Sequence, residues 1–421
     1  MTTTTKTQDL IACHDKALSP NYARLPIAIE RGEGSLLYDL EGKRYIDLFA
    51  GFGAPVLGHC HQELVKAVTD QANKLWHVGN LLHTEPQVDA AERIQRLGFG
   101  GQSFFSHAGA DANEAAIKLA RLYGKANRGK SISEFGRYKV ISATLSFHGR
   151  SFATMGATGQ LAVRQGFEPL LPGFTNVAYN HIDAIKAAID DDTVAIIVEP
   201  IQGEGGIHVP DPDYFTKLRE LCDTHDLLLI ADEVWTGCAR TGRVFGHQLW
   251  NITPDIMTLG KGVGGGLPVG VMCAKPDIAE LYSAPKHGRV FHATTLGGNC
   301  LAMAATATVF KIIERDKLDQ RAHNLGQATM KRLRDAAANN CPAIKQVRGS
   351  GLFLGIEIND TKLPPAISTV KDIVAALIQR GVMINATKNG VLRLAPPLTI
   401  PEDLLNDGLS ALEAVLSGND G

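Results

Sequence analysis

Residues 258–273 read Thr-Leu-Gly-Lys-Gly-Val-Gly-Gly-Gly-Leu-Pro-Val-Gly-Val-Met-Cys, and they place Lys261 in a glycine-rich turn between two apolar runs. Glycine lets the backbone approach a large ligand without side-chain clash. A lysine amine that such packing screens from water can lose its proton near neutral pH and form a Schiff base with a carbonyl. Lys261 is therefore the first candidate catalytic residue.

Residues 260–265 of this stretch also match the G-x-G-x-x-G fingerprint of dinucleotide-binding proteins. That fingerprint must open a helix, whereas residues 267–273 read as a strand. We therefore reject a dinucleotide-binding fold. Because glycine and not serine or threonine follows Lys261, the stretch is no Walker A phosphate loop either.

Outward from this turn, strand and helix signals alternate. We expect strands at 138–143, 193–198, 227–231 and 256–259, and helices at 113–123 and 213–226. Such alternation implies a mainly parallel sheet covered by helices on both faces. Ligands collect beyond the carboxyl ends of such strands. Two of the strands lead into acids, Glu199 and Asp232, which are thereby directed toward the expected ligand crevice.

With 421 residues, the chain is too long for one ordinary core, so two or three domains are expected. We expect a large domain over 61–320 and a smaller one formed jointly by 1–60 and 321–421. The chain ends show short strands within 35–49 and near 352–358 and 391–395. They also show helices at about 319–339 and 367–380.

The composition, 44% hydrophobic and 20% charged, is typical of a soluble globular protein. A net charge of −2 gives no excess of positive charge that would indicate binding to nucleic acid or to an anionic membrane. The uncharged segment 293–310 is too polar for a membrane span and is expected to be a buried loop and helix. Seven cysteines without a CxxC pair indicate a reducing compartment, which we take to be the cytoplasm. Residues 59–61, His-Cys-His, lack a second ligand pair, so no metal site is expected.

Residues 104–114 run from an apolar segment through a small-residue turn into a helix. At Gly109 and Ala110, small side chains leave the first backbone N–H groups of that helix accessible. The helix dipole then favours a phosphate. An ordinary helix capped by Asp111 remains the alternative.

Asp232, at a strand end, has two interpretations. It could accept loop amides or cap a helix. A carboxylate that faces a pyridine nitrogen instead keeps that nitrogen protonated, so that the ring withdraws electrons from a carbanion. Together with Lys261 and the phosphate turn, Asp232 completes the set that pyridoxal 5'-phosphate requires.

Two arginines are candidate substrate ligands. Phe147 could stack on a flat ring, and Arg150, three residues later, could grip a carboxylate through two hydrogen bonds. Arg393 is a lone charge between apolar residues, a placement that normally requires a partner, and Glu204 is a candidate. An ordinary surface arginine is the alternative at each position.

This ordered set of motifs resembles the class III aminotransferases of pyridoxal-phosphate fold type I over nearly the whole chain. The motifs that carry the resemblance lie at 45–48, 57–61, 109–121, 147–150, 199–206, 232–234, 240–242, 260–261 and 294–299. The resemblance implies an α/β fold in which a large domain with a mainly parallel seven-stranded sheet accompanies a smaller α+β domain built from both chain ends. It also implies a homodimer with shared active sites.

By resemblance, Lys261 is the catalytic residue that holds the cofactor and moves the proton. The resemblance assigns cofactor binding to Gly109, Ala110, Phe147, His148, Asp232, Val234, Trp235 and Thr295, and substrate binding to Arg150, Glu204, Thr294 and Arg393. Thr295 is expected to reach the phosphate of the neighbouring subunit. Glu204 and Arg393 are expected to form a gate, paired for one substrate and open for 2-oxoglutarate or glutamate.

The implied reaction moves the terminal amine of N-acetylornithine to 2-oxoglutarate, a step of arginine biosynthesis. Ornithine, 4-aminobutyrate and N-succinylornithine are alternative donors, and a non-catalytic binding protein of the same fold is a remote alternative. The chain departs from the family pattern in having His107-Ala108 for Asn-Ser and Asp111 for Glu. Trp235 also stands where Gln is usual, which leaves the exact donor open.

Overall fold

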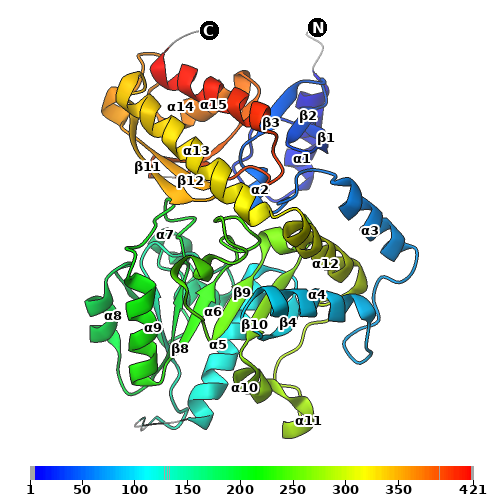
Figure 1. The fold of residues 1–421 in the computed structure, drawn as a ribbon, viewed down its shortest axis with the longest axis vertical. Helices are drawn as coiled ribbons and strands as arrows, with labels where there is room; N and C mark the ends of the chain where they lie inside the picture. The colour runs from blue at the N-terminus through cyan, green and yellow to red at the C-terminus, as the bar shows by residue number, and fades with distance from the viewer. Residues whose placement is uncertain (1–4, 128, 130, 132, 388, 419–421) are drawn as a thin grey trace.

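The centre of the molecule is a seven-stranded sheet with the strand order β4-β10-β9-β8-β7-β5-β6 (Figure 1). The computed structural model describes residues 5–418 except 128, 130, 132 and 388. Only β10 runs antiparallel to its neighbours in this sheet, so the predicted mainly parallel seven-stranded sheet is confirmed. Its strands are β4 (Gln102–Ser106), β5 (Lys139–Ala143), β6 (Phe174–Val177), β7 (Thr193–Val198), β8 (Leu228–Asp232), β9 (Ile256–Leu259) and β10 (Gly270–Ala274).

Helices cover both faces of this sheet because alternate residues of its strands point to opposite sides. In β7, Ile197 belongs to the apolar cluster that α5 (Gly109–Ala126) completes, whereas Ile196 belongs to the cluster of α9 (Tyr214–His225). All six residues of β7 are buried. Such continuous burial explains why the sequence shows an apolar run here and not an alternating pattern.

The two chain ends come together beside this sheet (Figure 1). Val382 of β13 (Val382–Met383) pairs with Ile46 of β3 (Arg44–Asp47) across more than three hundred residues of sequence. The sheet containing this pair has the order β1-β2-β3-β13, and a third sheet has the order β11-β12-β15-β14. We therefore retain as a proposal the division into 1–60, 61–320 and 321–421, with both ends in one smaller domain.

The remaining strands and the helices complete the chain. The strands are β1 (Ile29–Glu33), β2 (Leu36–Asp39), β11 (Ile344–Ser350), β12 (Phe353–Ile358), β14 (Asn385–Ala386) and β15 (Val391–Leu394). The helices are α1 (Lys6–Ala17), α2 (Ala50–Gly53), α3 (Gln62–Ala72), α4 (Glu85–Leu97), α6 (Phe152–Ala157), α7 (Leu161–Arg164), α8 (Ile182–Ala188), α10 (Pro276–Ala279), α11 (Ala284–His287), α12 (Cys300–Arg315), α13 (Leu318–Asn339), α14 (Val370–Gln379), α15 (Glu402–Ser417) and the 3₁₀ turns η1 (Gly246–Trp250), η2 (Lys261–Gly264), η3 (Glu280–Tyr282) and η4 (Asp360–Lys362).

Two local predictions have clear outcomes. The stretch that matches the dinucleotide fingerprint contains only the four-residue turn η2, and the strand β10 follows it. The prediction of a strand after this stretch is therefore confirmed. The prediction of a buried loop before α12 is wrong, because Ala293, Thr295 and Leu296 are exposed. They lie at the surface of the single chain, whereas most of α12 is buried. Within the described part of the chain, no helix combines the length and the apolarity needed to cross a membrane.

Candidate active site

A cavity of about 480 Å³ lies at the carboxyl ends of β7 and β8. Both acids directed there by the sequence pattern, Glu199 and Asp232, line it. The predicted site residues that line this cavity are Gly109, Ala110, Phe147, His148, Arg150, Glu204, Asp232, Val234, Trp235 and Lys261. Segments far apart in the sequence thus converge on the edge where a parallel sheet binds its ligand.

Lys261 begins the turn η2 with a φ of 47°, in the left-handed region that side chains rarely adopt. Its Nζ lies 3.6 Å from the centre of the Trp235 ring, and no hydrogen bond or ion pair joins it to another described residue. Burial lowers the pKa of Lys261 to about 8, against the opposing effects of Glu204 and Glu199. The amine is therefore neutral at lower pH than an ordinary lysine and is available as a nucleophile.

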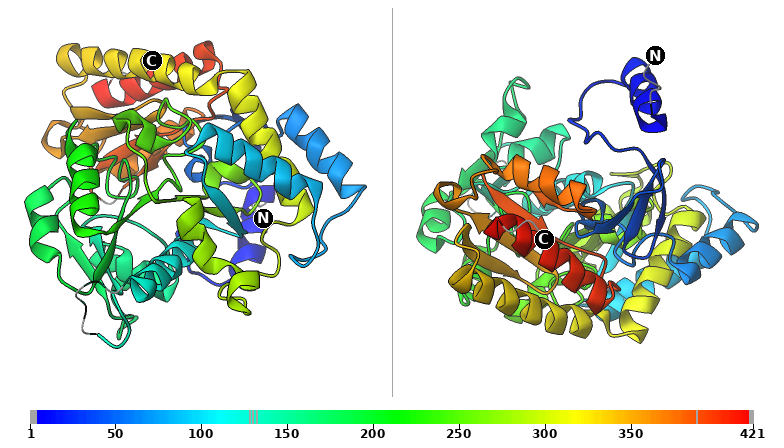
Figure 2. Two further views of the ribbon diagram at one scale, coloured as in Figure 1. Left: turned by 60° about the horizontal axis from the view of Figure 1, so that its bottom comes forward. Right: turned by 90° about the horizontal axis from the view of Figure 1, so that it is seen from above.

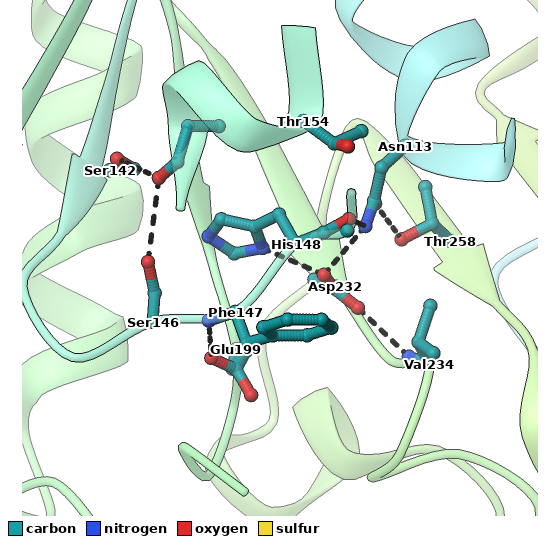
Figure 3. Close-up of polar contacts among 12 residues, drawn as sticks. Asn113, Ser142, Ser146, Phe147, His148, Thr154, Glu199, Asp232, Val234 and Thr258 are labelled. Carbon is teal, nitrogen blue, oxygen red and sulfur yellow. Dashed lines mark hydrogen bonds and ion pairs between the residues drawn. The ribbon is translucent and has the colours of Figure 1, made fainter. Parts of the chain in front are cut away.

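Asp232 is held in place from three directions (Figure 3). Its Oδ2 accepts a hydrogen bond from Asn113 Nδ2 at 2.8 Å and lies 2.7 Å from His148 Nδ1. Its Oδ1 accepts the Val234 N–H at 3.0 Å, so the loop-amide interpretation describes one of its contacts. Asn113 Oδ1 in turn accepts from Thr258 Oγ1 at 2.6 Å. These partners fix a carboxylate at the cavity wall, where it can face a ring nitrogen.

The N-terminus of the 18-residue helix α5 opens on the same cavity. Ala108 occupies the N-cap position, and no side chain caps the helix. The alternative in which Asp111 caps α5 is wrong, because Asp111 lies within the first helical turn. At Gly109, a Cβ atom would lie 2.6 Å from Cγ1 of Val234, so only glycine allows this approach. The uncapped N–H groups form a cradle for an anion.

Phe147 and His148 play different parts. Phe147 lines the cavity as the predicted ring cover, and its N–H donates to Glu199 Oε1 at 3.0 Å. The His148 ring is buried, and its Nδ1 contacts Asp232, so it positions that carboxylate. His148 also lines the cavity, and its contact with the cofactor stays a prediction. Figure 3 shows the His148 ring directed at the Asp232 carboxylate.

Glu199 is a site residue to which sequence reasoning assigned no role. Its Oε2 accepts the Gly203 N–H at 3.1 Å, so this one carboxylate joins the Phe147 loop to the loop that carries Glu204. Burial raises the pKa of Glu199 to about 7. The signals for it in the sequence were its position after an apolar strand and its place at the start of the motif 199–206.

Glu204, at the cavity wall, forms the anticipated ion pair with Arg393, which is not among the residues that line the cavity. Arg393 Nη1 lies 2.9 Å from Glu204 Oε2, and Arg393 Nε donates to Asn385 Oδ1 at 3.0 Å. Burial lowers the pKa of Arg393, and Glu204 offsets part of this effect. Arg150 is exposed, with its guanidinium carbon 5.7 Å from the centre of the Phe147 ring.

Thr294 and Thr295 do not line this cavity within one chain. They line a neighbouring hollow of about 750 Å³. Thr294 Oγ1 lies 3.1 Å from Nε2 of His107, which itself lines the active cavity, and Thr295 is exposed.

The residues present fit pyridoxal 5'-phosphate. An unpaired amine at Lys261, a fixed acid at Asp232, the Phe147 ring and the uncapped N-terminus of α5 all border one cavity. These are the groups that would bind the aldehyde, the ring nitrogen, the ring face and the phosphate of that cofactor.

Comparison with known proteins gives concordant matches. Residues 17–416 match the family model "Aminotransferase class-III". The chain is 41% identical to the acetylornithine aminotransferase of Caldanaerobacter subterraneus, over 97% of this chain and 99% of that protein. It resembles the acetylornithine aminotransferase structure from Elizabethkingia anophelis with a TM-score of 0.85 and 31% identity, covering 98% and 99% of the two chains. It also resembles the ornithine aminotransferase of Toxoplasma gondii, which holds PLP at partial occupancy in its active site, with a TM-score of 0.90, 29% identity and coverage of 98% and 95%.

Proposed function

Because the chain belongs to the class III aminotransferases, we propose that it transfers the terminal amine of N-acetylornithine to 2-oxoglutarate. The products are N-acetylglutamate semialdehyde and glutamate, and the step serves arginine biosynthesis. Several acetylornithine aminotransferases at about 40% identity over nearly the whole chain support this donor. The observation that carries the proposal is the convergence of Lys261 and Asp232 on one cavity.

The chain is a transaminase, and its cofactor is pyridoxal 5'-phosphate. When bound, this group withdraws electrons from the carbon that bears the reacting amine. With the cofactor bound, Lys261 Nζ, whose pKa is lowered to about 8, would take the proton from that carbon and later give it back as the general acid. Asp232 would hold the ring nitrogen in its protonated form, and the N-terminus of α5 would bind the phosphate.

Arg150 and Arg393 select the substrates in this proposal. Arg150, at the open end of the cavity, binds the donor carboxylate, so that the δ-amine and not the α-amine reaches Lys261. Arg393 stays paired with Glu204 while this donor is bound. In the second half-reaction Glu204 releases Arg393, which then binds a carboxylate of 2-oxoglutarate.

A donor panel tests this function. With 2-oxoglutarate as acceptor, we expect the kcat/KM for N-acetylornithine to exceed those for ornithine, 4-aminobutyrate and N-succinylornithine by about tenfold or more. The structural likeness to ornithine aminotransferase makes ornithine the second candidate. A higher kcat/KM for any other member of the panel would replace the donor proposed here while leaving the transaminase chemistry intact.

The gate gives a mutational prediction. Glu204→Ala removes the ion-pair partner of Arg393, so the guanidinium is free for dicarboxylates. We expect the KM for 2-oxoglutarate to fall by about threefold to tenfold. The kcat/KM for the donor divided by that for 2-oxoglutarate should therefore fall as well. Steady-state kinetics with each substrate varied in turn measures this change.

Glu402→Ala, which removes an exposed carboxylate at the start of α15, is the matched control. It should leave both kcat/KM values unaltered. Unchanged relative kcat/KM values in Glu204→Ala would discard the gate.

We also propose a homodimer with shared active sites, working in the cytoplasm. Leu81, at 97% exposure, Trp76 and Leu296 are large apolar side chains left uncovered on the single chain. Helix α1 buries none of its residues and stands apart from the body of the chain (Figure 2). A second copy that covers these groups would bring Thr295 to the phosphate of the neighbouring subunit.

A further inference from the structure

Trp235 is wedged into the wall of the active cavity. Its indole is 5% exposed and packs on Phe353, with a distance of 5.0 Å between the ring centres. A Cβ atom at Gly203 would lie 2.4 Å from indole Cε3, and one at Gly53 would lie 2.7 Å from Nε1. Two glycines thus admit the indole between two loops, and larger residues at either position would collide with it. The ring is therefore held in one place.

The same ring lies close to two cations of the site, Lys261 and Arg393. Lys261 Nζ lies 3.6 Å from its centre, which leaves no space for another atom between the amine and the ring. The guanidinium carbon of Arg393 lies 5.0 Å from the same centre. An indole face carries partial negative charge, so it attracts cations and repels anions. A carboxylate placed directly against the face of this ring is therefore disfavoured.

Arg393 keeps its position through other contacts as well. Its guanidinium carbon lies 5.3 Å from the Phe49 ring centre and 5.6 Å from that of Phe52, and its Nε donates to Asn385. Its side chain is 4% exposed, whereas that of Glu204 is 26% exposed. Loss of the indole would therefore open space beside an arginine that other groups still hold.

We propose that Trp235 is a specificity-determining residue that disfavours a carboxylate on the carbon bearing the reacting nitrogen. That carbon must lie close to Lys261 Nζ, which is 3.6 Å from the indole centre, so a carboxylate on it lies beside the ring. A terminal amine is borne by an uncharged methylene, which packs well against the same ring. The indole thus favours terminal amines over α-amino acids. This inference deepens the proposed function and rests on it.

The test compares the two half-reactions of the holoenzyme by stopped-flow absorbance, with no acceptor present. Glutamate carries a carboxylate on its reacting carbon, whereas the preferred terminal amine of the donor panel does not. In Trp235→Gln, we expect the kcat/KM ratio of glutamate to the terminal amine to rise about tenfold. Trp235→Phe, which keeps an aromatic face, should retain most of the selectivity of the unmodified enzyme.

Phe353→Leu is the matched control, because it loosens the packing behind the indole without touching either cation. Because the indole face remains, Phe353→Leu should change the ratio by much less than Trp235→Gln does. A second readout avoids turnover, since binding of glutarate, an unreactive dicarboxylate, can be measured by calorimetry. Trp235→Gln should bind glutarate about tenfold more tightly, while its affinity for butyrate, a monocarboxylate, should change by much less.

Three results would overturn the inference: an unchanged ratio in Trp235→Gln, a fall in that ratio, or an equal rise in Phe353→Leu. Failure of the proposed donor is a separate result. If another terminal amine of the panel is preferred, the ratio is measured against that amine. If the unmodified enzyme uses no terminal amine, the proposed function and this inference both fail.

Discussion

Lys261→Ala is expected to lower turnover by about 10⁴-fold or more, because no other described residue presents an amine to this cavity. The variant should still bind pyridoxal 5'-phosphate, since the N-terminus of α5, Phe147 and Asp232 are unaltered. We therefore expect loss of kcat with retained cofactor. Steady-state kinetics and cofactor titration by fluorescence quenching measure the two quantities separately.

Lys186→Ala is the matched control for this variant. Lys186 lies exposed on α8, away from the cavity, and its loss should not change kcat. Folding of Lys261→Ala is checked by its thermal unfolding temperature, which should be close to that of the unmodified protein. Full activity in Lys261→Ala would remove the lysine from the mechanism.

Asp232→Asn is expected to lower kcat by about 10³-fold. The substitution preserves the shape of the side chain but removes the negative charge that keeps the ring nitrogen protonated, so electron withdrawal weakens. An amide at this position would also face the Asn113 amide and the His148 ring, which now contact a carboxylate. Single-turnover absorbance with the donor alone isolates the proton-transfer step that should slow.

Asp183→Asn, at an exposed position in the first turn of α8, is the corresponding control and should retain full activity. Two quantities, kcat and the affinity for the cofactor, distinguish an electronic role of Asp232 from a merely structural one. We expect kcat to fall with little change in the affinity for the cofactor. If Asp232→Asn lost cofactor binding and kept its rate at saturating cofactor, the electronic role would be wrong.

Local patterns in the sequence were sufficient for much of the site. Apolar runs at 193–198 and 256–259 match β7 and β9 residue for residue. The ends of the runs 193–198 and 227–231 direct Glu199 and Asp232 to the ligand edge, because parallel strands share a carboxyl edge. Arg393, a charge among apolar neighbours, requires a partner, and Glu204 lies 2.9 Å away.

Other contacts between distant segments were not predictable in this way. Asn113 lies within a helical pattern and carries no signal that its amide would support Asp232, 119 residues later. The contact of His148 with Asp232 was not predicted for the same reason, because the spacing of residues does not show which way an imidazole points. Thr295 does not line the active cavity of its own chain, since the group that it is proposed to bind belongs to a second copy.

The central claim is that Lys261 tethers the cofactor in the cavity that Asp232 borders. Borohydride reduction of the holoenzyme makes such a linkage permanent, and peptide mapping by mass spectrometry then locates it. The account predicts one modified residue, Lys261, and no modification when the donor amine has first converted the cofactor to its amine form. Modification of a different lysine, or a cofactor that dissociates intact after reduction, would contradict it.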